Sequence, residues 1–167
     1  MTSIVVMGVA GCGKSTFGQA LAKQLNLPWI EGDDFHSAQS KAKMAAGTPL
    51  DDADRVGWLQ MLVLQIQKHP AGCVIGCSAL KKSYRDTLRQ AHHQAAGQAG
   101  RVKIAYLRLM REEAHRRVSN RAGHFFSDTL VASQFATLEE PSDEPGVTTL
   151  DATLETSILL KYFLNEA

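Results

Sequence analysis

The chain has 167 residues, of which 44% are hydrophobic and 21% are charged, and its formal net charge is +1 at pH 7. This length can bury the core of one domain, and the composition excludes a disordered chain. The near-zero charge gives no global field that would favour nucleic acid or an anionic membrane, so we expect neither as a partner.

Short β-branched runs alternate with helical patterns along the chain. The runs that predict strands are residues 3–8, 27–34, 73–78, 102–109 and 146–152, of which 27–34 fits the pattern least well. Apolar residues at helical spacing predict helices at 14–25, 53–68, 83–93, 111–121, 128–139 and 154–165. We therefore predict a three-layer α/β/α fold, in which a parallel sheet of about five strands carries helices on both faces, as one domain over 1–167.

The N-terminus and the cysteines favour a cytoplasmic protein. The first apolar run stops at Gly8 and has no basic residue before it, so it predicts neither a signal peptide nor a membrane span. Cys12, Cys73 and Cys77 form no C-x-x-C pair and have no His-rich partner cluster. We expect reduced thiols rather than a disulfide framework or a zinc site.

Residues 8–15, GVAGCGKS, match the phosphate-loop pattern G-x-x-x-x-G-K-[ST]. Glycines let successive backbone N–H groups approach a phosphate, and the following helix presents its positive end to the same charge. Lys14 is expected to reach the β- and γ-phosphates, and Ser15 to place its hydroxyl on Mg²⁺. The alternative is a glycine-rich turn that fits by chance, but the predicted strand before it and helix after it favour a P-loop NTPase-type nucleotide site.

The loop does not identify the phosphoryl acceptor. Water would make the protein an NTPase or a switch, whereas a small hydroxyl compound would make it a kinase. The N-K-x-D segment of guanine-specific switches is absent from the sequence. Cys77 and Ser78 follow the apolar strand at 73–78, where motor and repair ATPases usually carry an Asp.

A second cluster, EGDDFH at 31–36, follows the predicted strand 27–34. Open α/β sheets bind ligands at this end of their strands, and an Asp there can accept the proton of an attacking hydroxyl or hold Mg²⁺ through water. Asp33 is our first candidate and Asp34 the second. The alternative is a solvated turn or helix cap. His36 is a candidate donor to a substrate hydroxyl, although a lone His is more often structural.

Two further stretches place cations after turns or strands. Arg55, near the start of helix 53–68, suits bidentate capture of a carboxylate if it faces the cleft, and is otherwise a surface charge. Lys81 and Arg85, in CSALKKSYRD at 77–86, would line the same crevice or form a solvated basic helix start.

The fourth cluster, RRVSNRAGHFF at 116–126, suggests a mobile arginine-bearing lid at about 117–130. In such a lid Arg117 would cover the nucleotide and Arg121 would stabilise charge on the transferring phosphoryl group. The alternative is an ordinary helix end, with basic residues that favour its dipole and Gly123 as its terminator.

Taken together, these segments resemble the gluconokinases, small P-loop kinases related in fold to shikimate and nucleoside-monophosphate kinases. The matching stretches occur in family order between residues 6 and 141: VMGVAGCGKST, GDDFH, KMAAGTPLDDADRVGWL, CSALKKSYRD, GHFF and SQFATLEEP. The phosphate loop is generic to a large superfamily, whereas CSALKKSYRD and the combination of GHFF with QFATLEEP are far more specific. Cys12 stands where such loops often have Ser, and Gly57 where the family often has Pro.

The resemblance implies ATP-dependent phosphorylation of D-gluconate at its terminal hydroxyl, which gives 6-phospho-D-gluconate and ADP. The implied ATP and Mg²⁺ site comprises Gly8, Gly11, Cys12, Gly13, Lys14, Ser15, Thr16 and Arg117. Asp33 would act as the base, or orient the hydroxyl and Mg²⁺, and Arg121 would join Lys14 and Asp33 in catalysis. The implied substrate contacts are Asp33, His36, Arg55, Lys81, Arg85, His124 and Gln134.

Two rival interpretations stay open at this point. One is a kinase of the same fold that acts on another aldonate, a shikimate-like acid or a nucleotide. The other is a non-catalytic module that binds ATP and a partner protein. Related kinases are often dimers, so the resemblance also raises a homodimer as an expectation.

Overall fold

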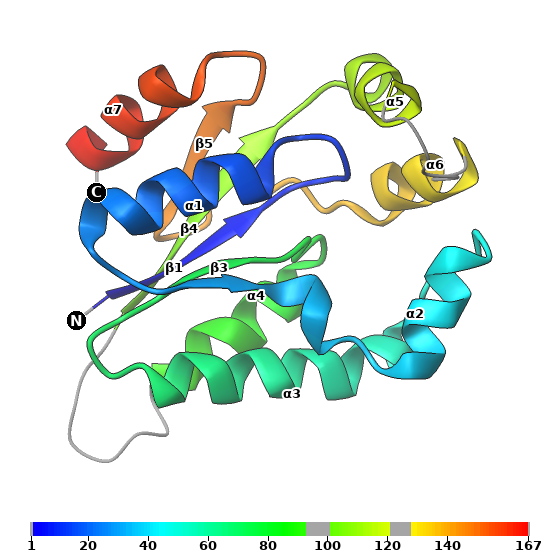
Figure 1. The fold of residues 1–167 in the computed structure, drawn as a ribbon, viewed down its shortest axis with the longest axis horizontal. Helices are drawn as coiled ribbons and strands as arrows, with labels where there is room; N and C mark the ends of the chain where they lie inside the picture. Colours follow the sequence, from blue (N-terminus) through cyan, green and yellow to red (C-terminus); the bar gives the residue numbers. More distant parts are fainter. Residues whose placement is uncertain (1, 93–100, 121–127, 167) are drawn as a thin grey trace.

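In the computed structural model, which describes residues 2–92, 101–120 and 128–166, the chain folds as a three-layer α/β/α sandwich (Figure 1). The strands are β1 (Thr2–Met7), β2 (Trp29–Glu31), β3 (Val74–Gly76), β4 (Arg101–Arg108) and β5 (Val147–Asp151). The α-helices are α1 (Lys14–Leu25), α2 (Ala38–Ala45), α3 (Asp52–Lys68), α4 (Lys82–Arg89), α5 (Arg111–Ser119), α6 (Asp128–Thr137) and α7 (Thr156–Glu166). Short 3₁₀ turns, η1 (Gly32–Phe35) and η2 (Gln90–His92), follow β2 and α4.

The five strands form one parallel sheet in the order β2-β3-β1-β4-β5. The register aligns Val5 of β1 with Ile75 of β3 on one side and with Ile104 of β4 on the other. The crossovers from β1 and from β3 run in opposite directions across the sheet, so the crevice at the carboxyl ends of β1 and β3 is where this topology binds ligands. α2, α5 and α6 gather at that end of the sheet in Figure 1.

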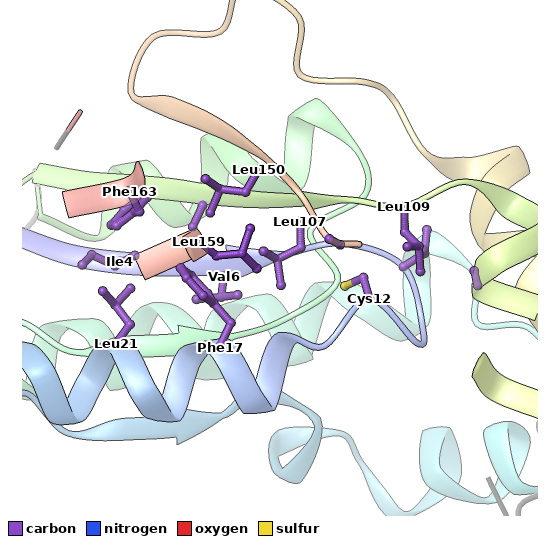
Figure 2. Close-up of a cluster of buried hydrophobic side chains, with 14 of the residues drawn as sticks. Ile4, Val6, Cys12, Phe17, Leu21, Leu107, Leu109, Leu150, Leu159 and Phe163 are labelled. Atoms are coloured by element: carbon purple, nitrogen blue, oxygen red, sulfur yellow. The ribbon is translucent and has the colours of Figure 1, made fainter. Parts of the chain in front are cut away.

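Two apolar cores separate the layers. The first lies between the sheet and the pair α1 and α7, where Phe17 and Phe163 meet edge to face at 6.2 Å between ring centroids (Figure 2). The second lies on the opposite face, where Trp58, Leu62 and Ile66 of α3 pack against the sheet. The nearly continuous apolar strands are explained by these two cores, because both sheet faces are covered.

Local signals explain the helix ends. α1 begins after Gly13, whose φ of 92° suits glycine, and ends at Asn26 in the left-handed region at φ 53°. α3 begins with a capping box, in which Asp51 accepts from the Asp54 N–H and Asp54 accepts from the Asp51 N–H.

The predicted fold is confirmed, including the five parallel strands and the bounds of α1. Two elements were not predicted, namely α2 and η1. α2 contains Lys41, Lys43 and several alanines and buries only Ser40, so it has no apolar stripe that could reveal it. The predicted lid at 117–130 is described only at its flanks, because residues 121–127 lie outside the described part of the chain.

Candidate active site

The glycine loop joins β1 to α1 at the carboxyl edge of the sheet. Gly8, Gly11 and Gly13 all have positive φ. A Cβ atom at Gly8 would lie 2.7 Å from the Leu107 carbonyl oxygen, so this position has no room for a side chain. The Lys14 ammonium donates to the carbonyl oxygens of Gly8 at 3.0 Å and Val9 at 3.1 Å, which folds its positive charge back over the loop.

Cys12 belongs to the core rather than to the surface of the loop. Its side chain is buried among residues of the first core (Figure 2), and its thiol lies beneath Gly8. Only the backbone of Cys12 is therefore available to a phosphate.

A cavity of about 240 Å³ opens beside the glycine loop. Its wall brings together nine of the residues predicted for the site: Gly11, Gly13, Lys14, Ser15, Thr16, Asp33, His36, Arg55 and Gln134. The remaining lining residues are Ala10, Glu31, Met44, Pro49, Leu50, Ser78, Val118, Leu130 and Ser133. Segments that are far apart in the sequence, from residue 10 to residue 134, thus meet in one cavity. Its wall combines the phosphate loop with acidic and basic side chains.

Glu31 is a site residue that the sequence did not single out. Its carboxylate accepts a hydrogen bond from the Ser15 hydroxyl at 2.7 Å, and both residues line the cavity. Glu31 is the last residue of β2, and β2 pairs through β3 with β1, so the carboxyl end of the strand is carried to the phosphate loop. The position of Glu31 near the end of a predicted strand could have indicated a site residue. Asp33 and Asp34 in the same stretch were chosen as the candidate carboxylates instead.

Asp33 and His36 come from η1 and the residue after it. The Asp33 side chain is 68% exposed and lines the cavity, and its Oδ1 lies 3.8 Å from His36 Nε2. His36 stacks on Trp58 at 4.5 Å between ring centroids, and the Trp58 indole N–H donates to the Gly32 carbonyl at 2.7 Å. Trp58, predicted only as core, therefore fixes both the turn and the imidazole.

The surroundings of His36 favour the neutral form of its imidazole. Burial lowers its pKa, and the positive charges of Arg55 and Lys41 lower it further, while Asp33 opposes them. Nδ1 is buried and has no hydrogen-bond partner among the described residues. Because Nε2 faces the Asp33 carboxylate, we assign the proton of the neutral ring to Nε2.

Arg55 reaches the cavity from the first turns of α3. Its Nη1 donates to the carbonyl oxygens of Leu50 and Asp51, and its guanidinium carbon lies 5.8 Å from the centroid of the Tyr84 ring. The Tyr84 hydroxyl in turn donates to Asp52. Backbone carbonyls and an aromatic face thus hold this cation, and no ion pair joins it to a carboxylate of the described residues, so its charge stays available to an anion.

Lys81 is placed differently from Arg55. Its ammonium donates to both Asp52 oxygens at 2.8 and 2.7 Å, and it is not part of the cavity wall. This pairing raises the pKa of Lys81 and lowers that of Asp52. Lys81 therefore holds the Asp52 carboxylate that accepts from Tyr84, and it does not form part of the cavity surface.

The structure places Arg85, a predicted substrate contact, away from the cavity. Its side chain is fully buried and lies outside the cavity wall. It donates to the carbonyl oxygens of Ala79 at 2.9 Å, Leu80 at 3.0 Å and Glu139 at 3.0 Å, and it pairs with the Glu144 carboxylate. Arg85 thus joins the loop between β3 and α4 to the 139–144 segment, and these contacts support a structural role.

Two more predicted residues contact the glycine loop. Arg117 pairs with Glu113 at 2.6 Å and donates to the Gly11 carbonyl at 3.5 Å, beside the loop but outside the cavity wall. Gln134 of α6 accepts a hydrogen bond from the Ala10 N–H at 2.6 Å. Arg121 and His124 lie outside the described residues.

Similarity to known proteins agrees with this geometry. A family model described as an AAA domain matches residues 4–141. A probable gluconokinase of Schizosaccharomyces pombe is 40% identical over 153 residues, which cover 87% of this chain and 77% of the relative. The chain belongs to the gluconokinase family.

Two further relatives of the family support the assignment. The thermoresistant gluconokinase of Escherichia coli is 38% identical over 151 residues, with 88% of this chain and 82% of the relative covered. The crystal structure of a gluconokinase from Sinorhizobium meliloti superposes with a TM-score of 0.86 at 36% identity, over 98% of this chain and 90% of that chain. The gluconokinase family assignment made from the motifs is therefore confirmed, and with it the class of ATP-dependent carbohydrate kinases.

Within residues 2–92, 101–120 and 128–166, none of the helices combines the length and the apolar character needed to cross a bilayer.

Proposed function

We propose that this chain transfers the γ-phosphoryl group of ATP to the terminal hydroxyl of D-gluconate, giving 6-phospho-D-gluconate and ADP. The observation that carries the proposal is the shared cavity, in which Lys14 and the glycine loop face Asp33, His36 and Arg55. We call residues 8–16 the donor half of the site, and Asp33, His36 and Arg55 the acceptor half. A phosphate donor and a hydroxyl acceptor bound in these halves would meet within one cavity of about 240 Å³.

The acceptor half fits a linear sugar acid. Such a molecule carries one carboxylate, several hydroxyl groups and a reactive terminal hydroxyl. Arg55 supplies a planar cation for the carboxylate, and Asp33 supplies a carboxylate for the reactive hydroxyl. His36, with its proton on Nε2, supplies a donor for a hydroxyl oxygen.

Phosphoryl transfer requires mostly positioning and charge neutralisation from the protein. Lys14 already lies over the loop, and exchange of its carbonyl partners for phosphate oxygens would bring its charge to the transferring group. The acceptor hydroxyl bonds to the phosphorus as the bond from phosphorus to the β–γ bridging oxygen breaks, and Asp33 accepts the hydroxyl proton. Arg117 and, from outside the described residues, Arg121 and His124 are proposed to cover the nucleotide and the phosphoryl group.

Ser15 and Glu31 fit an Mg²⁺ ion that enters with ATP. Mg²⁺ prefers oxygen ligands and keeps several waters beside substrate phosphates, so it needs few protein groups. The described residues contain no cluster of three or more His, Cys, Asp or Glu side chains suited to hold a metal by themselves. We propose that the Ser15 hydroxyl binds the ion and that Glu31, with Asp33, holds its waters; the bound ion would neutralise phosphate charge.

An ADP-release assay tests the proposal. The protein is incubated with ATP and Mg²⁺ and with each member of a panel: D-gluconate, other aldonates, shikimate, nucleoside monophosphates and no acceptor. We expect D-gluconate to give the highest kcat/KM and the no-acceptor control to give little ADP. A higher kcat/KM with another acceptor would reassign the substrate, and ADP formation that no acceptor stimulates would contradict a kinase. Dimer formation and a cytoplasmic location stay predictions, which size-exclusion chromatography with light scattering and cell fractionation would check.

A further inference from the structure

Gln134, which the resemblance implies as a substrate contact, forms a hydrogen bond with the phosphate loop. Its Oε1 accepts the Ala10 N–H at 2.6 Å, across 124 residues of sequence. A backbone N–H can only donate, so the amide oxygen must point to the loop and its amide nitrogen must point elsewhere. We propose that Gln134 is a positioning residue of the donor half, which holds the phosphate loop in the shape that ATP requires.

The bond between Ala10 and Gln134 lies next to the carbonyl groups that hold Lys14. Ala10 directly follows Gly8 and Val9, whose carbonyl oxygens hold the Lys14 ammonium. On the other side of the loop, the Gly8 N–H donates to the Ser78 carbonyl at 3.3 Å. The stretch that presents these carbonyls is therefore held at both ends, by Ser78 after β3 and by Gln134 on α6.

The helix that carries Gln134 is itself anchored to the sheet. Just beyond α6, the Glu139 N–H donates to the Leu80 carbonyl at 2.9 Å, and the Glu139 carboxylate accepts the Lys82 N–H at 2.6 Å. The next residue, Glu140, accepts the Tyr106 hydroxyl of β4 at 2.9 Å. These contacts anchor the end of α6 against the start of α4 and against β4, so Gln134 contacts the loop from a helix that is tied to the sheet.

This inference rests on the proposed ATP site, and its test separates the two substrates. Gln134→Met keeps an unbranched side chain of similar length but removes the acceptor. The net value of one hydrogen bond predicts a rise of about three- to tenfold in KM for ATP and in the Kd of ADP measured without acceptor. We expect KM for gluconate to change by less than about twofold, since the bond that the variant loses faces the phosphate loop. Thr137→Val is the matched control, because within the described residues the Thr137 hydroxyl bonds to the Ser133 carbonyl of its own helix.

The opposite pattern overturns the proposal. A rise in KM for gluconate with unchanged ADP affinity would make Gln134 an acceptor contact, and unchanged constants for both substrates would remove any role for the bond. Ala10→Pro deletes the donor from the other side and keeps the test valid if Gln134→Met does not fold. The Ala10→Pro variant should raise the Kd of ADP to a similar extent. In the double variant, Gln134→Met should raise that Kd by less than about a further twofold, because the bond is already lost. If the two substitutions instead multiplied their separate effects on the Kd, the two residues would not share one bond. If the wild-type protein did not phosphorylate gluconate, the proposed function would fail, whereas ADP binding would still test Gln134.

Discussion

The donor half and the acceptor half of the site are built in different ways. The donor half is one contiguous stretch of backbone groups and a lysine, in which three glycines have positive φ. In the acceptor half, Asp33 lies in η1, His36 directly follows η1, and Arg55 lies in α3. Its side chains owe their positions to residues that do not line the cavity, such as Trp58 and Tyr84. The donor half thus follows largely from local sequence, with Ser78 and Gln134 holding it from outside, whereas the whole acceptor half depends on tertiary packing.

Lys14→Ala tests the donor half most severely. Removal of the cation that faces the phosphates should lower kcat by about a thousandfold, or about 4 kcal/mol. The fold should persist, because the lysine contributes only two hydrogen bonds to loop carbonyls. The measurement is ADP release with gluconate, together with a thermal melt. Lys23→Ala, at an exposed site in the last turn of α1, is the control. Near-normal turnover in Lys14→Ala would remove the phosphate-loop assignment.

Arg85→Met tests whether a cation near the acceptor half is structural. The change leaves three backbone carbonyls and part of the buried Glu144 carboxylate without their donor. We expect the free energy of unfolding to fall by at least about 3 kcal/mol, as when one partner of a buried ion pair is removed. Urea denaturation measures this loss. Lys82→Met, which breaks an exposed pair with Asp86 on the same helix, should cost less than about 1 kcal/mol.

The kinetics of Arg85→Met decide between the two roles. Folded Arg85→Met enzyme should keep a KM for gluconate within about threefold of wild type, because the guanidinium lies outside the cavity wall. A stable variant with a strongly raised KM for gluconate would restore Arg85 to the substrate contacts.

Asp33→Asn tests the chemistry of the acceptor half. Loss of the carboxylate that accepts the hydroxyl proton should lower kcat by about a hundredfold, while KM for gluconate changes little. Asp34→Asn is the control, since Asp34 is the exposed neighbour and does not line the cavity. If Asp33→Asn changed only KM, Asp33 would be a binding residue, and a larger kcat loss in Asp34→Asn would exchange the two assignments.

The same division explains how much the sequence predicted. The sheet, the bounds of α1 and the glycine loop follow from patterns a few residues long, so they were predictable. Arg55 and Arg85 both read as cations beside a cleft, yet one lines the cavity and the other is buried against Glu144, 59 residues away. Glu139 and Glu140, in the family-specific stretch QFATLEEP, cap α4 and bind Tyr106. Motif residues identify a family whether they contact ligand or support the residues that do, and only the tertiary contacts separate these roles.

The smallest expected effect concerns His36, which the packing of the acceptor half keeps neutral. Burial holds its folded-state pKa below the ordinary value of 6.5. The unfolded chain therefore binds a proton at a higher pH than the folded chain does. Between these two pKa values the unfolded state carries more protons, so the free energy of unfolding must fall as pH drops below about 6.5. The slope from this one group cannot exceed about 1.4 kcal/mol per pH unit.

His36→Phe isolates this contribution, because phenylalanine can stack on Trp58 but does not titrate. Urea denaturation at pH 7.5, 6.5 and 5.5 should show a difference in stability between wild type and variant that shifts in favour of His36→Phe only below about pH 6.5. Carboxylates with lowered pKa values, such as Asp52 and Glu144, lose their stabilisation at lower pH and are common to both proteins, so they cancel in the difference. Stability curves that stay parallel across this range would show that His36 gains a proton as easily in the folded chain. Burial against Trp58 would then have no effect on the titration of the imidazole.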